Sequence, residues 1–181
     1  MKKIKQLKGE YTVVTILLII FMIGIVYVYY QSHTVSYASL DYAIQKTTNG
    51  GQVLAKYDFD KGVFTFIKNS RKKYDYYYLI NKRWYNKGRI RETKYKIEKE
   101  YTVTIYYVPV NKITFIRVDS YHELSNIKDS IDTEFQQLIT KDGDSFFFGG
   151  TFKEIPDDYT IYLDDNKYLL KEYNGLFEMY S

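Results

Sequence analysis

One N-terminal segment constrains this chain most: no Asp, Glu, Lys or Arg occurs from Tyr11 to Leu40, and Val13–Tyr30 is almost wholly apolar. Eighteen helical residues rise about 27 Å, which is close to the hydrocarbon thickness of a bilayer. Four lysines stand just before this segment, and such a bias predicts a cytoplasmic N-terminus. The sequence therefore predicts a single-pass cell-membrane protein that contacts the lipid bilayer through residues 13–30 and places residues 31–181 outside the cell.

This prediction divides the chain into four parts. They are a basic cytoplasmic tail at residues 1–12, a transmembrane helix at residues 13–30, a juxtamembrane spacer at residues 31–38 and an extracytoplasmic domain at residues 39–181. The last part is long enough to form one domain with its own core, and a second domain is not expected.

A cleaved secretory signal is the alternative interpretation of the apolar segment. Ser36-Tyr37-Ala38 has the small-x-small pattern of a cleavage site, so cleavage near Ala38 would give a secreted product. The apolar run is longer than a usual signal core, and Tyr27, Tyr29 and Tyr30 stand at its outer end, where aromatic side chains anchor a spanning helix. We therefore expect the segment to be retained.

The composition of the chain predicts a folded domain that is rich in strands. The sequence holds 22 Tyr and 11 Phe against 2 Pro, and aromatic residues suit half-buried pleated surfaces. It holds no Cys, so the exported part must be stabilised by its core without disulfides. The expected fold is a β-rich α+β domain with mostly antiparallel strands and one or two short helices.

Runs of alternating or aromatic residues between turn residues predict the strands. They are Val53–Tyr57, Val63–Lys68, Tyr74–Ile80, Tyr101–Val108, Ile113–Val118, Tyr159–Leu163, Tyr168–Tyr173 and Leu176–Tyr180. Within the fourth run, Thr102 and Thr104 share one face and the apolar residues between and after them share the other. Asn174-Gly175 suits a type I′ turn, so the last three strands are expected to form a meander.

Two segments have helical spacing. Ser39 can cap a short helix that begins at Leu40 and ends before Asn49-Gly50-Gly51. In Leu124–Leu138, apolar residues recur at helical intervals with acids and glutamines between them, which predicts a second helix.

Several motifs of the exported part resemble membrane-anchored proteins of Bacillus-like Gram-positive bacteria that have one N-terminal span or signal and a small β-rich exported domain. The resemblance implies location and architecture, brings no catalytic residues and favours strands over a helix at Leu124–Leu138. The motifs that carry it are Ser39–Ile44, Gly50–Leu54, Asp58–Val63, Tyr76–Tyr78, Lys82–Trp84, Lys141–Asp144 and Asp164–Leu169.

Charge is segregated along the exported part. Lys68–Lys99 holds twelve basic and three acidic residues, whereas Asp119–Ser181 holds five basic and fourteen acidic ones. We favour ordinary pairing between neighbouring strands of opposite sign as the explanation. The alternative is a face that binds an anionic surface such as an envelope polymer. The candidate residues for that face are Lys72, Lys73, Arg83, Arg89 and Arg91.

No pattern in the sequence indicates catalysis, a cofactor or a metal site. His122 lies in Asp119–Glu123, which holds the residue types of a nucleophile, a base and an acid, but groups adjacent in sequence do not form a triad. A zinc site has no support, because the chain has no Cys and its two His are distant from each other in the sequence. Acidic turns such as Asp142-Gly143-Asp144 suit calcium chemistry, but they are also the residues that hairpin turns require.

These observations predict an envelope protein with a non-catalytic exported binding or interaction domain. The expected partner is another membrane protein or an anionic envelope polymer, and no nucleic acid is expected. Two alternatives stay open at this point. One is a cell-envelope hydrolase that acts on wall polymer, and the other is a pilin-like subunit, which would need one helix running unbroken from the apolar segment into the domain.

Overall fold

The computed structural model describes residues 14–26, 35–70, 73–86, 90–173 and 176–179. The chain divides into two compact units, residues 1–36 and residues 37–181, each of which is treated by itself.

Residues 14–26 of the first unit form a helix whose large apolar side chains are exposed. Among the residues that the structure describes, no helix combines the length and the apolar character needed to cross a membrane. Residues 13 and 27–30 of the predicted span lie outside the described residues. The membrane anchor therefore stays a prediction.

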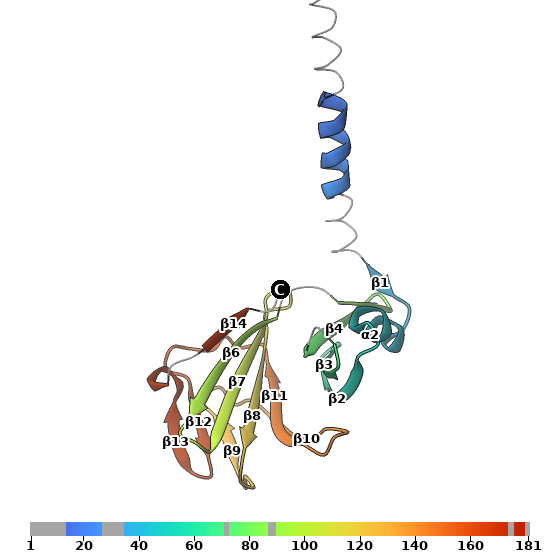
Figure 1. The fold of residues 1–181 in the computed structure, drawn as a ribbon. Coiled ribbons are helices and arrows are strands. Elements are labelled where there is room, and N and C mark those ends of the chain that lie inside the picture. Colours follow the sequence, from blue (N-terminus) through green and yellow to red (C-terminus); the bar gives the residue numbers. More distant parts are fainter. Residues whose placement is uncertain (1–13, 27–34, 71–72, 87–89, 174–175, 180–181) are drawn as a thin grey trace, which may run out of the picture. The chain divides into compact units, whose positions relative to one another are not determined.

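The second unit is built from three antiparallel sheets, which confirms the β-rich α+β expectation (Figure 1). The five-stranded sheet has the order β1 (Ser36–Tyr37), β5 (Arg83–Tyr85), β4 (Tyr74–Ile80), β3 (Gly62–Lys68), β2 (Gln52–Phe59). The six-stranded sheet has the order β10 (Phe135–Ile139), β11 (Ser145–Thr151), β8 (Ile113–Ser120), β7 (Tyr101–Val108), β6 (Arg91–Ile97), β14 (Leu176–Met179). The three-stranded sheet has the order β13 (Asn166–Leu169), β12 (Thr160–Leu163), β9 (Ile127–Asp129).

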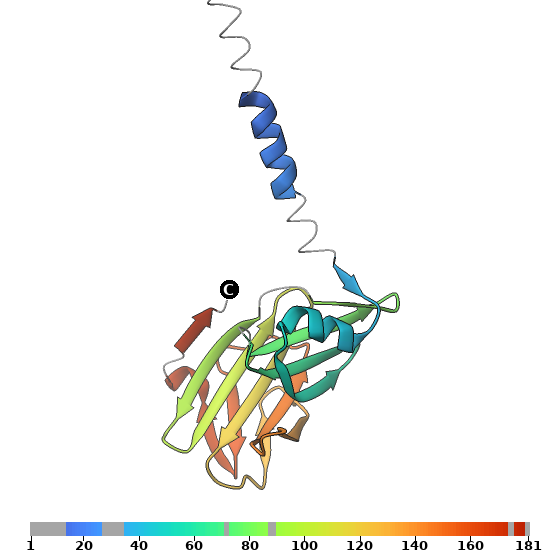
Figure 2. The same ribbon diagram turned by 45° about the vertical axis from the view of Figure 1, so that its right-hand side comes forward.

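A short helix, α2 (Leu40–Thr48), packs on the five-stranded sheet (Figure 2). The Tyr42 backbone N–H donates to Ser39 Oγ at 3.3 Å, so Ser39 caps the helix as predicted. The helix ends at Asn49, which has a φ of 50° and a left-handed conformation that asparagine tolerates. Ala43 and Ile44 of the helix pack against Tyr77 of β4.

The six-stranded sheet is covered on both faces because alternate residues of its strands enter two different cores. Tyr106 and Val108 of β7 belong to a core shared with the five-stranded sheet, which we call the aromatic core. Val103 and Ile105 of the same strand belong to a second core, shared with the three-stranded sheet. The predicted alternation along β7 is therefore confirmed, and the structure adds a covering layer on each face. The aromatic core consists of Tyr57, Phe64, Phe66, Tyr74, Tyr76, Tyr78, Ile90, Tyr106, Val108, Ile113, Phe115, Phe146 and Phe148.

The helix predicted at Leu124–Leu138 is wrong. This segment contains β9, an irregular stretch and the start of β10. The Asp129 carboxylate accepts the backbone N–H groups of Ile131 and Thr133 at 3.2 and 2.8 Å, and such local bonds compete with a helix. Asp132 adds a positive φ of 58°, which a regular helix does not contain.

The predicted C-terminal meander is also wrong, at its last strand. β12 and β13 form the predicted hairpin, but β14 pairs with β6 of the six-stranded sheet instead of with β13. A 3₁₀ turn at Leu170–Glu172 follows β13. The predicted turn at Asn174-Gly175 lies outside the described residues. The pairing of β14 joins residues that are 82 to 88 positions apart in the chain, and hairpin turn chemistry does not predict such long-range contacts.

Candidate binding basin

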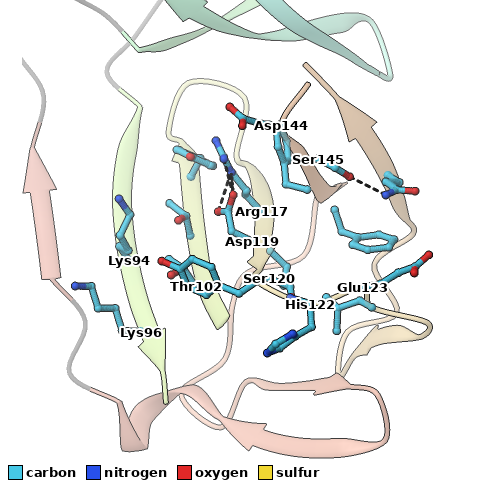
Figure 3. A pocket seen from close by; sticks show the side chains of 18 residues that line it. Lys94, Lys96, Thr102, Arg117, Asp119, Ser120, His122, Glu123, Asp144 and Ser145 are labelled. Carbon is cyan, nitrogen blue, oxygen red and sulfur yellow. Dashed lines mark hydrogen bonds and ion pairs between the residues drawn. The ribbon is translucent and has the colours of Figure 1, made fainter. Parts of the chain in front are cut away.

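An open cavity of about 890 Å³ lies on the face of the six-stranded sheet that also carries the aromatic core (Figure 3). We call this cavity the basin. Its volume is in the range of small-molecule binding sites. The lining residues are Lys94, Lys96, Thr102, Thr104, Tyr106, Arg117, Val118, Asp119, Ser120, Tyr121, His122, Glu123, Leu124, Gln137, Asp144, Ser145, Phe146 and Phe147.

Strand register builds the floor of the basin. One cross-strand row joins Lys94 of β6, Thr104 of β7 and Arg117 of β8. The next row joins Lys96, Thr102 and Asp119 in the same way. Side chains two residues apart on a strand point to the same face, so both rows face the basin. The floor therefore has the half-buried Thr102 and the buried Thr104 in the middle, with lysines on one side and an Arg–Asp pair on the other.

Arg117 and Asp119 form an ion pair that the surrounding rings hold in place. Arg117 Nε lies 2.9 Å from each Asp119 carboxylate oxygen, and Nη2 also donates to Oδ1. The guanidinium carbon lies 4.0 Å from the ring centre of Phe146 and 5.3 Å from that of Phe66. Burial, the largest single influence, would lower the pKa of Arg117, but the hydrogen bonds and charge of Asp119 together with Tyr106 outweigh burial and raise it. The pair is thus a rigid, neutral hydrogen-bonding unit.

Tyr106 lies at the inner end of the basin, where the aromatic core begins. Its side chain is buried, and this burial is the main reason that the pKa of Tyr106 is raised, although nearby Arg117 opposes the shift. The Tyr106 hydroxyl is therefore neutral at physiological pH and does not add charge to the basin.

One wall of the basin is basic. Lys94 Nζ lies 3.8 Å from a carboxylate oxygen of Glu92, whose other oxygen accepts the Tyr74 hydroxyl at 2.6 Å. Lys96 is exposed and forms no ion pair with another residue whose side chain the structure describes. Lys94 is thus partly neutralised, whereas Lys96 presents a full positive charge to the basin.

Two exposed acids also line the basin. Figure 3 shows Asp144 above Arg117 and Glu123 at the right-hand edge, so the two carboxylates lie well apart from each other. Glu123 and Asp144 are exposed, and within the described part of the chain neither forms an ion pair. Gln137 donates to the hydroxyl of Ser145, the residue after Asp144, at 2.7 Å.

The segment Asp119–Glu123, which the sequence singles out around His122, does lie at the basin. The His122 backbone N–H donates to Ser120 Oγ at 3.1 Å, and Asp119 is bound to Arg117. These contacts are not those of a nucleophile and its base, because they do not join the imidazole to a hydroxyl. Tyr121 is 84% exposed at the same edge.

The five cations proposed from the sequence do not gather at the basin. Lys72 and Arg89 lie outside the described residues. Lys73, Arg83 and Arg91 are exposed, but they precede β4, begin β5 and begin β6 respectively. Arg91 also points to the face of β6 opposite Lys94, because the two positions differ by an odd number. The two lysines that do line the basin, Lys94 and Lys96, belong to Lys68–Lys99 but are not among the five candidates.

The acidic turns have structural partners. Asp142 pairs with Lys68 at 2.6 Å. The Asp164 carboxylate accepts hydrogen bonds from the Ser125 hydroxyl and from the backbone N–H groups of Ser125 and Asn126, and these bonds lower the pKa of Asp164. Among the described residues, no group of three or more His, Asp and Glu is placed to hold a metal ion.

Comparisons with protein-family models, with curated proteins and with solved structures find no match for this chain. The resemblance to membrane-anchored proteins of Gram-positive bacteria therefore stays a prediction from the sequence.

Proposed function

We propose that this chain is a membrane-anchored bacterial envelope protein whose exported domain is a non-catalytic binding module that takes its ligand in the basin. The observation that carries the proposal is the floor of the basin, where polar side chains from three neighbouring strands share one face of a packed sheet. A binding site needs such preorganised donors and acceptors on a rigid scaffold.

Two features support a binding role over a purely structural one. Arg117 and Asp119 neutralise each other's charge, but Lys96, Glu123 and Asp144 have no ion-pair partner among the described residues. The basin therefore keeps charges of both signs that a bound molecule can use. The apolar segment 13–30 and the lysines before it support the location at the membrane.

Cell fractionation tests the location. We expect the full chain in the membrane fraction, with a C-terminal tag that added protease removes from intact protoplasts. The N-terminal sequence of the mature protein separates the two interpretations of the apolar segment. A soluble product that begins near Ser39 would contradict the anchor.

Thermal unfolding of the full chain in detergent micelles tests the binding role. A ligand that binds only the folded state at 100 times its Kd stabilises it by about 2.7 kcal/mol, so an envelope fraction that contains the ligand raises the unfolding midpoint. Thr102→Trp would fill the floor of the basin and abolish the increase. Lys128→Trp, at an exposed position in β9 outside the basin, is the matched control and should keep it. No increase with any envelope fraction would contradict the proposal.

A second candidate function is hydrolysis of wall polymer, because His122, Ser120 and Glu123 all line the basin. Release of soluble fragments from purified wall polymer, lost in His122→Ala, would favour this hydrolase. If the domain is non-catalytic, an envelope fraction still raises the unfolding midpoint of His122→Ala. Neither the wild type nor this variant then releases fragments from wall polymer.

No observation favours the pilin-like alternative. Ser36–Tyr37 is a strand, and α2 begins as a separate helix at Leu40. The unbroken helix that a pilin-like subunit requires is therefore not present in residues 35–48.

A further inference from the structure

The edge of the basin carries an exposed aromatic ring, that of Tyr121. Among the residues whose side chains the structure describes, Tyr121 is the most exposed of the large hydrophobic ones. Its backbone N–H donates to the Glu100 carbonyl at 3.2 Å, which extends the pairing of β7 and β8 by one residue beyond Ser120. The Tyr121 side chain therefore lies on the same face as those of Arg117 and Asp119. The ring thus offers a flat apolar surface to a ligand.

The Arg117–Asp119 pair keeps hydrogen-bonding capacity toward the basin. The guanidinium has more N–H groups than its bonds to Asp119 and to the Tyr106 hydroxyl use. The carboxylate can accept about four bonds, and among the described residues it accepts only from Arg117. The two side chains are 26% and 36% exposed, so a ligand can reach both. The pair therefore presents a donor and an acceptor side by side, which suits two neighbouring hydroxyl groups of a ligand.

The charges around the basin balance one another. Figure 3 shows the lysines at one side, one acid above the Arg117–Asp119 pair and another acid at the right-hand edge. His122 aside, the lining residues include three cations and three anions, namely Lys94, Lys96, Arg117, Asp119, Glu123 and Asp144. A net charge of zero gives no overall attraction for a polyanion or a polycation. The ligand expected here is therefore uncharged.

A sugar ring combines the properties that these residues select. One of its faces carries mainly C–H groups, whose partly positive hydrogens pack on the electron-rich face of an aromatic ring. Its edge carries neighbouring hydroxyls, each of which both donates and accepts hydrogen bonds. A simple hexose also carries no charge.

We propose that the basin binds a neutral saccharide, with the C–H face of one sugar ring stacked on Tyr121 and two neighbouring hydroxyls bonded to Arg117 and Asp119. This inference rests on the proposed binding function and names the class of ligand. One hydroxyl donates to the Asp119 carboxylate, and the other accepts from the Arg117 guanidinium. The basin of about 890 Å³ has room for more than one ring, so the expected ligand is a short stretch of oligosaccharide.

Three probes test the proposal by isothermal titration of the full chain, in micelles of a detergent without a sugar headgroup. Cellotriose is a neutral trisaccharide, trigalacturonic acid carries a carboxylate on each ring, and tetraethylene glycol is neutral but has no ring and no neighbouring hydroxyls. We expect cellotriose to bind at least tenfold more tightly than tetraethylene glycol and no more weakly than trigalacturonic acid. We also expect the affinity for cellotriose to be the same at low and high salt, because salt screens only charged partners.

Variants of the stacking ring and of the ion pair sharpen the test. Tyr121→Ala should weaken cellotriose at least tenfold, and Tyr121→Phe, which keeps the ring, should bind like the wild type. Asp119→Asn should also weaken cellotriose at least tenfold, and the unfolding midpoint of each variant shows that it is folded. Tyr162→Ala removes an exposed tyrosine of β12 that does not line the basin, and this matched control should keep the wild-type affinity.

Three results would overturn the inference. Equal affinity of the wild type and Tyr121→Ala for cellotriose would show that no sugar ring stacks there. Tighter binding of trigalacturonic acid, weakened by salt, would make the basin an anion site. The absence of cellotriose binding would rule out the neutral saccharide. The proposed binding function would still stand in all three cases if an envelope fraction raised the unfolding midpoint of the wild type and not of Thr102→Trp.

Discussion

The same face of the six-stranded sheet has two halves of opposite character. In β7, Tyr106 and Val108 lie in the aromatic core, and Thr102 and Thr104 lie in the basin. We call these the covered half and the open half, because the five-stranded sheet packs on the first and not on the second. The alternation of side chains is continuous along the strand, so the change in polarity marks the place where the covering layer ends.

The neighbouring strand β8 changes polarity at the same level. Ile113 and Phe115 are buried in the aromatic core, whereas Arg117 and Asp119, on the same face, line the basin. Arg117 also touches the ring of Phe66 in the five-stranded sheet, so it stands at the border of the two halves. One end of each of these strands is therefore packed in the aromatic core, and the other end lines the basin, where we propose that a ligand binds.

The largest expected loss of folding stability comes from a substitution in the covered half. Phe148 is fully buried, and its ring centre lies 5.1 Å from Phe64, 5.1 Å from Phe66 and 5.6 Å from Phe115. Phe148→Ala removes these contacts and leaves a cavity, so it should lower the free energy of unfolding by about 3–5 kcal/mol. Urea unfolding of the full chain, followed by the fluorescence of Trp84, measures the change. A loss below about 1 kcal/mol would mean that the aromatic core is loosely packed.

Alkaline pH should also act on the covered half. Burial, together with the nearby charge of Asp60, raises the pKa of Tyr76 from 10.0 to about 12. The native state therefore keeps the Tyr76 proton between about pH 10 and pH 12, while the unfolded state releases it. The stabilisation is complete below pH 10 and is lost as pH rises toward 12.

Two pKa units correspond to about 2–3 kcal/mol, so a clear drop in the urea midpoint is expected across this range. The Tyr76→Phe variant removes the ionisable group and should make the drop smaller. If the wild type and the variant lose the same stability between pH 10 and pH 12, Tyr76 is not responsible for the alkaline loss.

A smaller loss of folding stability is expected at the border between the covered half and the open half. Asp119→Ala leaves the Arg117 guanidinium, whose side chain is 26% exposed, without its carboxylate partner. Charged hydrogen bonds contribute about 1.5–3 kcal/mol, and partial exposure reduces this, so a loss of about 1–2 kcal/mol is expected. A double-mutant cycle with Arg117→Met isolates the pair from the packing of Arg117 on Phe146. A coupling energy near zero would show that the pair does not hold the floor of the basin.

Much of the fold could be predicted because its strands carry strong local signals. The bounds predicted for Tyr74–Ile80 and Tyr101–Val108 are those of β4 and β7. Both are runs of aromatic or β-branched residues, and such residues favour strands. The helix prediction for Leu124–Leu138 failed because the spacing of apolar residues does not reveal the role of Asp129. The carboxylate of this residue accepts hydrogen bonds from the backbone of Ile131 and Thr133. Local patterns also gave no sign that β14 would pair with β6.

The candidate site was only partly predictable. The sequence places Thr102 and Thr104 on one face, but it does not show that Lys94 and Arg117 lie on either side of Thr104. That arrangement depends on the register of three strands and on where the five-stranded sheet stops. The charge segregation was visible in the sequence, and the signal that was missed is the alternation of Lys94 and Lys96 on one face of β6.

The smallest expected effect is in the open half. Lys96 is exposed and has no ion-pair partner among the residues whose side chains are described, so Lys96→Gln should change the free energy of unfolding by less than about 0.5 kcal/mol. Urea unfolding of the full chain measures this, with Phe148→Ala as the reference for a residue on the same face in the covered half. A loss of 1 kcal/mol or more for Lys96→Gln would mean that the basin supports the fold. The proposed division of each strand into a stabilising end and a binding end would then fail, since the open half would carry stability as well.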